Sequence, residues 1–237
     1  MAVRLSKRMG ALAQMVTVGN RLCDVGCDHG FLPIFLVQQG VIPSAIAMDI
    51  NEGPLAAARE HIAAYGLQQQ ITTRLSDGLS GIKEQETDTI LIAGMGGALV
   101  IHILTEGRKV AQSAKELILQ PQSEVAQVRR FLWQEGYDIL AEDMVVEDGK
   151  YYPMMKVSFA STNRQQEAPT EAAFLFGPLL LRQRHSVLQE YLLREQKIQR
   201  EVLGRLQAQE QTDAIALRER EIRAYLKEID GCLAQGE

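Results

Sequence analysis

Two glycines and two carboxylates are interleaved in the segment CDVGCDHG, residues 23–30. Glycines allow a tight backbone turn and let a ligand approach the main chain closely. A dinucleotide-binding loop has a different glycine spacing, and an acid such as Asp24 before the first glycine is unfavourable beside a pyrophosphate. The segment therefore predicts a turn that binds a cationic ligand, with a purely structural turn between a strand and a helix as the alternative.

Two further acids follow the next two β-rich runs. Asp49 comes 23 residues after Gly26, about the distance at which an acid holds ribose hydroxyls in nucleotide-binding folds. It could equally cap the helix that starts in NEGPLAAA. Asp77-Gly78 follows QITTRLS, where methyltransferases place a group near the adenine amino group, and where a plain turn is the alternative. Acids at the ends of three consecutive strands favour S-adenosylmethionine, which carries an ammonium and a sulfonium but no phosphate.

The fourth β-rich run ends in IAGMGG, residues 92–97. Enzymes that methylate exocyclic amino groups often carry Asn-Pro-Pro-Tyr or Asp-Pro-Pro-Tyr here, and this chain does not. Glycines at this place would open backbone amides and space beside the reactive methyl group. The segment argues against N6-adenine methylation and leaves a ring nitrogen such as adenine N1, which presents an in-plane lone pair.

The elements that position these residues alternate along the first two thirds of the chain. Strands are predicted at 21–25, 44–50, 70–76, 88–94, 115–121, 138–149 and 151–160, and helices at 31–40, 53–66, 97–111 and 123–137. This alternation predicts right-handed βαβ units and a parallel sheet with helices on both faces. Asp148-Gly149 predicts a closing hairpin. The fold class is therefore α/β. By analogy, a parallel sheet that ends in an antiparallel hairpin is expected to be a Rossmann-like class I methyltransferase sheet.

The sequence pattern changes after residue 160. A polar stretch at 161–172 predicts a linker, and the apolar residues of 185–207 and of 215–229 recur at helical and heptad spacing. We expect an antiparallel two-helix coiled coil with a turn at 207–213. The predicted domains are a methyltransferase domain at 1–160 and a linker with a helical coiled-coil domain at 161–237. Its mixed charges favour a solvated coiled coil over a dedicated RNA-binding arm.

Composition excludes several classes of protein. The 237 residues carry 25 Lys+Arg against 30 Asp+Glu, a net charge of −5, which excludes a uniformly basic nucleic-acid binder but not a local basic patch. No apolar run is long enough to cross a bilayer, and the amino terminus lacks a signal-peptide pattern. The three cysteines fit neither a disulfide framework nor a zinc site. We expect a cytoplasmic protein with no membrane and no metal partner.

Seven segments together resemble one family. They are Leu5-Ser6-Lys7-Arg8, DVGCDHGFLP, AMDIN, LSDGL, IAGMGG, Gln120-Pro121-Gln122 and EDGKYYPM. The pattern is similar to that of the bacterial tRNA (adenine-N1)-methyltransferases that act on position 22. It runs from about residue 4 to 157 and continues in a two-helix carboxy-terminal appendage. The resemblance implies methyl transfer from S-adenosylmethionine to N1 of adenine 22 in tRNA.

The resemblance also implies a place for each cofactor-binding residue. The methionine end of the cofactor would meet Asp24, Gly26, Cys27, Asp28, His29 and Gly30; the ribose would meet Asp49, Ile50 and Asn51; the adenine would meet Asp77 and Gly78; and the sulfonium side would meet Gly94, Met95, Gly96 and Gly97.

The nucleophile dictates what catalysis requires. Neutral adenine N1 needs no general base, so positioning of N1 and the methyl group supplies most of the catalysis. A carboxylate near the base would stabilise the positive charge that develops. Asp28 is the first candidate for this role and His29 the second. The alternative for His29 is a loop histidine that donates to a backbone carbonyl.

The target base must be unpaired or extruded to expose N1. We expect Arg4, Lys7 and Arg8 to contact the tRNA backbone, and Gln120 and Gln122 to read a base edge. Tyr151 and Tyr152 could stack on the base, or they could be ordinary strand aromatics. The expected partner is tRNA, and the expected state is a monomer or a weak dimer through the helical domain.

Other interpretations stay open at this point. A methyltransferase of another RNA or of a small molecule would keep the cofactor and change the acceptor. A non-catalytic RNA-binding adapter would use the helical hairpin and leave the sheet vestigial. An NAD-binding oxidoreductase is the third, and Asp28 in place of a fingerprint glycine counts against it.

Overall fold

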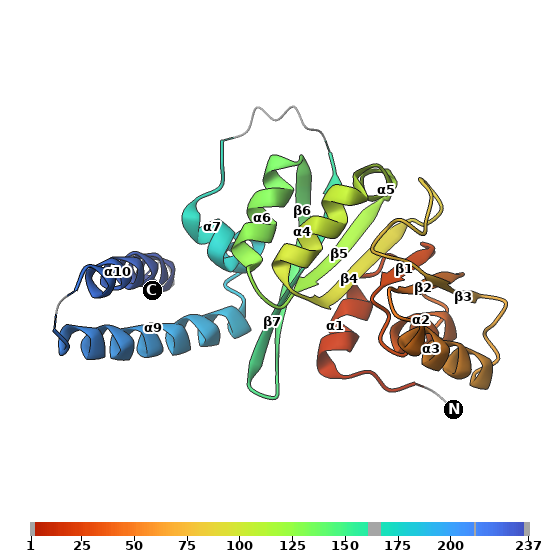
Figure 1. Cartoon of the computed structure of the whole chain (residues 1–237), viewed down its shortest axis with the longest axis horizontal. Coiled ribbons are helices and arrows are strands. Elements are labelled where there is room, and N and C mark those ends of the chain that lie inside the picture. The colour runs from red at the N-terminus through yellow and green to blue at the C-terminus, as the bar shows by residue number, and fades with distance from the viewer. Residues whose placement is uncertain (1–2, 161–166, 211, 235–237) are drawn as a thin grey trace. The chain divides into compact units, whose positions relative to one another are not determined.

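The structure is a computed structural model that describes residues 3–160, 167–210 and 212–234. The chain divides into two compact units, Met1–Glu167 and Ala168–Glu237 (Figure 1). The first unit contains the sheet, and the second is helical throughout its described residues. Of the predicted linker 161–172, residues 161–166 lie outside the described residues, and the rest leads into a helix at Glu171.

A seven-stranded sheet in the order β3-β2-β1-β4-β5-β7-β6 forms the first unit (Figure 1). Its strands are β1 Leu22–Val25, β2 Ala45–Asp49, β3 Ile71–Leu75, β4 Thr89–Met95, β5 Glu116–Pro121, β6 Tyr137–Glu147 and β7 Lys150–Phe159. The first five strands pair in parallel, and β7 runs antiparallel between β5 and β6. This confirms the predicted α/β sheet. The strand order reverses between β1 and β4, where open sheets of this kind form their ligand crevice.

The central strands are buried on both sides and separate two hydrophobic cores. On one side Leu22 and Leu91 pack with α1 (Lys7–Met15), α2 (Phe31–Gln38) and α3 (Glu52–Ala64). On the other side Ile90 and Ile92 pack with α4 (Gly97–Glu106), α5 (Arg108–Ser113) and α6 (Val125–Gln134). Apolar side chains on both faces of each strand explain why these strands read as continuous hydrophobic runs.

The predicted single helix at 97–111 is two helices, α4 and α5, which join at Gly107. A Cβ at this position would lie 2.6 Å from Cβ of Leu79. The chain therefore breaks its helix where it passes the loop after β3, and only glycine allows this approach. The periodicity of apolar residues continues across the break, so the pattern alone did not reveal it.

The hairpin predicted at Asp148-Gly149 is confirmed. Both residues have positive φ, 50° and 71°, as the central positions of a type I′ turn require. The flanking residues Glu147 and Lys150 pair across β6 and β7. The hairpin places Glu147 at the end of a long strand, where it reaches the start of α1.

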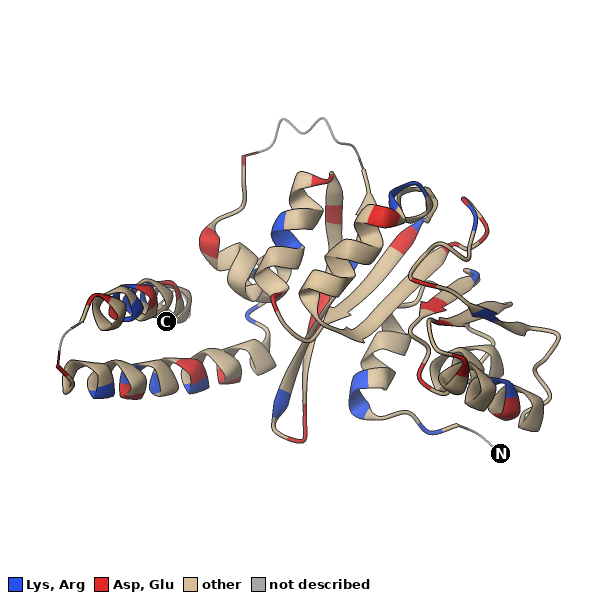
Figure 2. Cartoon of the chain, in the orientation of Figure 1, with Lys and Arg blue, Asp and Glu red and all other residues tan. Residues whose placement is uncertain are grey.

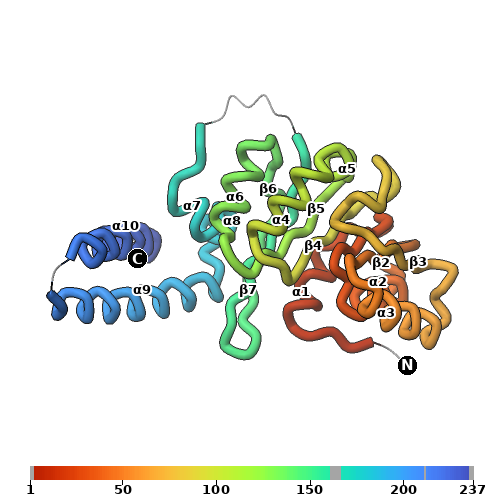
Figure 3. Tube along the Cα trace, in the orientation of Figure 1, coloured from red at the N-terminus to blue at the C-terminus, as the bar shows by residue number. Residues whose placement is uncertain are grey.

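The second unit contains four helices in its described residues. They are α7 (Glu171–Phe176), α8 (Pro178–Arg182), α9 (Ser186–Gln207) and α10 (Asp213–Ala234), and Figure 3 traces the chain through them. Charges of both signs follow one another along α9, as Figure 2 shows.

The structure does not confirm a regular antiparallel coiled coil in α9 and α10. Tyr191 lies 3.3 Å from Tyr225 between hydroxyl oxygens, while Arg200, farther along α9, pairs with Asp230, farther along α10. In an antiparallel pair, residues with higher numbers on α9 would contact residues with lower numbers on α10. Leu192 of α9 and Leu226 of α10 are buried, whereas Ile198, one of the apolar residues that recur at helical spacing in 185–207, is 38% exposed.

Among the described helices, none is long and apolar enough to cross a membrane. The same residues contain no cluster of His, Cys, Asp and Glu that could hold a metal ion.

Candidate functional site

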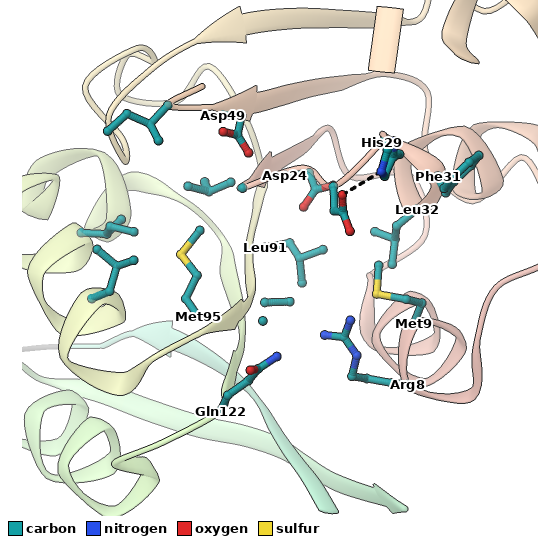
Figure 4. Close-up of a pocket in the computed structure, with 18 of the residues that line it drawn as sticks. Arg8, Met9, Asp24, His29, Phe31, Leu32, Asp49, Leu91, Met95 and Gln122 are labelled. Carbon is teal, nitrogen blue, oxygen red and sulfur yellow. Dashed lines mark ion pairs between the residues drawn. The ribbon is translucent and has the colours of Figure 1, made fainter. Parts of the chain in front are cut away.

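A cavity of about 710 Å³ opens at the carboxyl ends of β1 to β4, the point where the strand order reverses (Figure 4). The first turn of α1 forms one wall, and the loops after the four strands form the others. The predicted site residues that line it are Arg4, Arg8, Asp24, Gly26, Asp28, His29, Asp49, Ile50, Asn51, Asp77, Gly78, Gly94, Met95 and Gln122. The topology thus brings together residues separated by more than a hundred positions in sequence.

The turn after β1 is fixed by its backbone. The N–H groups of Gly26 and Cys27 both donate to the carbonyl of Met48, each at 2.8 Å. Gly26 has a φ of 75°, and a Cβ there would meet the Met95 side chain. Glycine therefore keeps the floor of the pocket open between β1 and β4. Gly30 lies behind the turn, with its Cα facing Ala58 of α3.

Asp24 is the second-last residue of β1, lines the pocket and is only 7% exposed. Burial, followed by the charges of Asp49 and Asp28, raises the pKa of its carboxyl to about 7. No Lys or Arg of the described residues forms an ion pair with Asp24. A buried carboxylate without a cationic partner is costly, and a bound cation would relieve this cost.

Asp49 precedes the N-cap position of α3 and lines the pocket, and its predicted contact with ribose hydroxyls stays a prediction. One oxygen, Oδ1, accepts from the backbone N–H of Asn51 at 2.8 Å and supports the start of α3. Asn51 itself stands at the N-cap position and makes no capping bond with its side chain. The carboxylate lines the pocket next to Ile50, an apolar side chain that is 59% exposed.

Asp28 and His29 form a pair at the mouth of the pocket. His29 Nε2 lies 3.2 Å from Asp28 Oδ1, and the Asp28 side chain is 88% exposed (Figure 4). The imidazole of His29 therefore faces a carboxylate, whereas the predicted alternative gave it a backbone carbonyl. The carbonyl of His29 contacts Nδ1 of His61 at 3.0 Å, and the His61 ring stacks on Phe31.

Asp77 and Gly78 form the pocket wall after β3. Gly78 has a φ of 53°, and a Cβ there would lie 3.2 Å from Ile103 of α4. With Leu99 and Ile103 this wall is largely apolar, which suits the face of an aromatic ring.

The four residues Gly94 to Gly97, at the end of β4 and the start of α4, divide into two pairs. Gly94, with a φ of 79°, and Met95 line the pocket, and the carbonyl of Met95 accepts from the N–H of Gln122 at 2.8 Å. Gly96 and Gly97 lie outside the pocket lining, at the start of α4. Gly97 packs so tightly against Ser123 and Glu124 that any Cβ would clash with backbone.

Comparison with known proteins identifies the family. The model of the TrmK family, tRNA (adenine(22)-N(1))-methyltransferase, matches residues 22–228. The chain belongs to the TrmK family. It is 35% identical over 186 residues to the tRNA (adenine(22)-N(1))-methyltransferase of Bacillus subtilis, which covers 78% of each chain.

Two solved structures resemble the whole fold. Streptococcus pneumoniae Sp1610 in complex with S-adenosyl-L-methionine has a TM-score of 0.85 and 32% identity, over 97% of this chain and 100% of that one. Mycoplasma capricolum TrmK in complex with S-adenosyl-homocysteine has a TM-score of 0.80 and 27% identity, over 96% of each chain. These findings confirm the predicted class I methyltransferase sheet and the resemblance from which the activity was inferred.

Other residues predicted for this TrmK family member lie outside the pocket lining. Gln120 is fully buried: its Oε1 accepts from Arg8 Nη1 and from the N–H of Gly94, and its Nε2 donates to a backbone carbonyl. It is therefore not placed to read a base edge, and it holds the pocket wall. Tyr152 stacks under the Arg8 guanidinium at 5.4 Å, and its neighbour Tyr151 pairs with Val146 across the hairpin.

Cys27 is 1% exposed, and burial followed by the charge of Asp24 raises the pKa of its thiol. A protonated, buried thiol is inert as a nucleophile, in keeping with a reaction that needs none. Cys27 contributes its backbone N–H to the turn and not its side chain.

Sequence reasoning missed the apolar part of the pocket. Its members are Leu5, Met9, Val25, Phe31, Leu32, Leu91, Ala93, Leu99 and Ile103. These residues read as core positions because their local pattern is that of buried strands and helices. No sequence signal separates an apolar side chain that lines a pocket from one that fills a core.

Proposed function

We propose that the chain binds S-adenosylmethionine in the pocket above β1 and β4 and methylates N1 of adenine 22 in tRNA. The observation that carries this assignment is Asp24, a buried carboxylate without a basic partner beside the glycine turn of a TrmK family member. When bound, the cofactor supplies an electrophilic methyl group on a sulfonium and leaves as a neutral thioether.

The acids would hold the charged and polar groups of the cofactor at separate places. Asp24 and the turn to Gly30 would receive the ammonium end. Asp49 has one oxygen on Asn51 and a second one for ribose hydroxyls. Asp77 and the apolar wall with Ile103 would receive the adenine ring.

The acceptor side would begin at Gly94 and Met95, which leave space beside the methyl group. Adenine N1 attacks with its own lone pair, so the chain has to align the base and exclude water. The product carries positive charge until the N6 proton is lost. Asp28, exposed at the pocket mouth and paired with His29, is our candidate for stabilising that charge.

The tRNA would approach over the first turn of α1. Arg4 and Lys7 are exposed there, next to the pocket mouth, and phosphate contacts of this kind provide positioning. Gln122 lines the pocket and remains a candidate for the base edge. We place the tRNA methyltransferase in the cytoplasm, and assign the sheet unit to catalysis and the helical unit to a separate domain.

Methyl transfer to tRNA tests this proposal. Purified protein is incubated with labelled S-adenosylmethionine and an unmodified tRNA transcript, and with a matched transcript in which guanosine replaces adenine 22. We expect 1-methyladenosine, identified by mass spectrometry of nucleosides, in the first transcript only. Equal methylation of both transcripts, or of free adenosine, would contradict the assigned acceptor.

A further inference from the structure

Arg8 lies inside the pocket, on the opposite side of it from Asp49 (Figure 4). It is half-buried, whereas its neighbour Lys7 and the preceding Arg4 are exposed. Its guanidinium therefore differs from the other cations of this basic segment, which face solvent. A phosphate contact on the outer surface would not require this burial.

Three contacts fix the Arg8 side chain and the helix that carries it. Nη1 donates to Oε1 of the fully buried Gln120 at 2.8 Å, and the guanidinium carbon lies 5.4 Å from the centre of the Tyr152 ring. Glu147 accepts from the first backbone N–H groups of α1 and so anchors the start of the helix. A guanidinium held on a buried amide and an aromatic face is preorganised for a planar anion.

No carboxylate of the described residues forms an ion pair with Arg8. The pocket meanwhile contains the four acids Asp24, Asp28, Asp49 and Asp77. Such a pocket would repel an anionic group of a ligand unless a basic side chain in the pocket could pair with that group. A half-buried arginine that faces this cavity meets that requirement.

We propose that Arg8 binds the carboxylate of the methionine moiety of S-adenosylmethionine. This inference rests on the proposed function and adds the partner for the one negative charge of the cofactor. The acids receive the ammonium and the ribose, and Arg8 receives the carboxylate.

The neighbours of Arg8 favour the cofactor over an RNA phosphate. A Cβ on Gly94 would lie 3.5 Å from Arg8 Nη1, and Gly94 and Arg8 share the same acceptor on Gln120. Arg8 is thus adjacent to the segment assigned to the sulfonium side, from which the methionine chain extends. Gln120 acts as a positioning residue, since it holds both Arg8 and the backbone of Gly94.

The test compares S-adenosylmethionine with decarboxylated S-adenosylmethionine, which keeps the ammonium and the sulfonium and lacks only the carboxylate. Dissociation constants are measured by calorimetry for wild type and Arg8→Ala. We expect wild type to bind the decarboxylated compound about 10- to 100-fold more weakly, as for a lost charge-assisted hydrogen bond. In Arg8→Ala the two ligands should bind equally, or the decarboxylated one more tightly.

The control is Arg108→Ala, which removes an exposed arginine of α5 outside this pocket and should keep the wild-type discrimination. Arg8→Lys keeps a cation and should give an intermediate ratio of the two dissociation constants. This variant replaces Arg8→Ala in the test if Arg8→Ala is not stably folded. An Arg8→Ala protein that discriminates as strongly as wild type would overturn the inference. So would unchanged cofactor affinity with a raised KM for tRNA, which would assign Arg8 to an RNA phosphate. Wild type that binds neither compound would instead contradict the proposed function.

Discussion

Acidic side chains at the two ends of the parallel strands β1, β2, β4 and β5 differ in their partners. At the amino ends, Asp88 pairs with Arg21 and Lys115, and Glu116 is held by Thr17, Thr89 and Lys156. At the carboxyl ends, Asp24 and Asp49 form no ion pair with any Lys or Arg of the described residues.

The pKa values of these carboxyls differ in the same way. The hydrogen bond from Arg21 holds the pKa of Asp88 well below its usual range, and burial raises that of Asp24 to about 7. For Glu116, burial would raise the pKa, but hydrogen bonds from both threonines and Lys156 outweigh it and lower the pKa. Acids with basic partners stabilise the fold. Acids at a pocket without such partners are candidates for binding a cationic ligand.

The largest expected effect is on the stability of the protein without cofactor. Asp24 has a folded pKa of about 7 against 3.8 unfolded, so its ionisation costs stability as pH rises between these values. Asp24→Asn should therefore raise the free energy of unfolding at pH 8, by on the order of 4 kcal/mol at most. Urea titrations at pH 4.5 and 8 should show a gain that is several-fold larger at pH 8, since only about 1 kcal/mol of it is present at pH 4.5. If Asp24→Asn were less stable than wild type at pH 8, the claim that the Asp24 carboxylate lowers stability would be contradicted.

Glu116→Gln should have the opposite effect. Its folded pKa is lowered, so its contribution is present above the unfolded value of 4.5 and is lost as pH falls through the folded one. We expect a loss of about 2 kcal/mol at pH 7, since the pairing with Lys156 is removed from a buried network. Methyl transfer per folded molecule should stay at the wild-type level. A loss of cofactor affinity without a loss of stability would mean that the amino ends of the strands also contribute to cofactor binding.

Asp28→Ala sharpens the distinction within the pocket itself. Because Asp28 is exposed at the mouth and Asp24 is buried in the floor, the substitution should lower kcat about tenfold and change the cofactor Kd less. Steady-state kinetics with saturating tRNA measures kcat, and calorimetry measures the Kd for the cofactor. A wild-type kcat would remove Asp28 from the mechanism.

The smallest effect belongs to the exposed basic residues. Arg4→Ala with Lys7→Ala should raise the KM for tRNA a few-fold and reduce its salt dependence, since two phosphate contacts would be lost. Glu60→Gln, an exposed charge change on α3, should leave KM unchanged. A KM that stays at the wild-type value at low salt would place the RNA elsewhere.

The alternation of strands and helices was predictable because the central strands are apolar runs, and β1, β2 and β4 end beside a glycine or an acid. The acids at Asp24, Asp49 and Asp77 were predictable as a group, since parallel strands bring their carboxyl ends to one edge. Their roles were inferred partly from the family resemblance.

What sequence could not predict depends on distant contacts. Lys7 and Arg8 are equivalent in sequence, and only the packing of α1 against Glu147 and Tyr152, more than a hundred residues away, turns Arg8 into the pocket. Gln120 reads as a polar strand end, yet the same packing buries it. Heptads define an apolar helix face but not the angle at which two helices cross, so the pattern in α9 and α10 indicated a seam that the structure does not confirm.

The central claim is that an unpaired, buried Asp24 binds the positive charge of the cofactor. Calorimetric titration of S-adenosylmethionine between pH 5.5 and 8, on wild type and Asp24→Asn, tests it most directly, since the ratio of the two affinities cancels titration of the ligand itself. We predict that wild type binds about 100-fold more tightly at pH 8, and that this advantage declines by up to tenfold per unit below pH 7 as Asp24 protonates. Equal affinities at pH 8, or an advantage that does not change with pH, would contradict the claim.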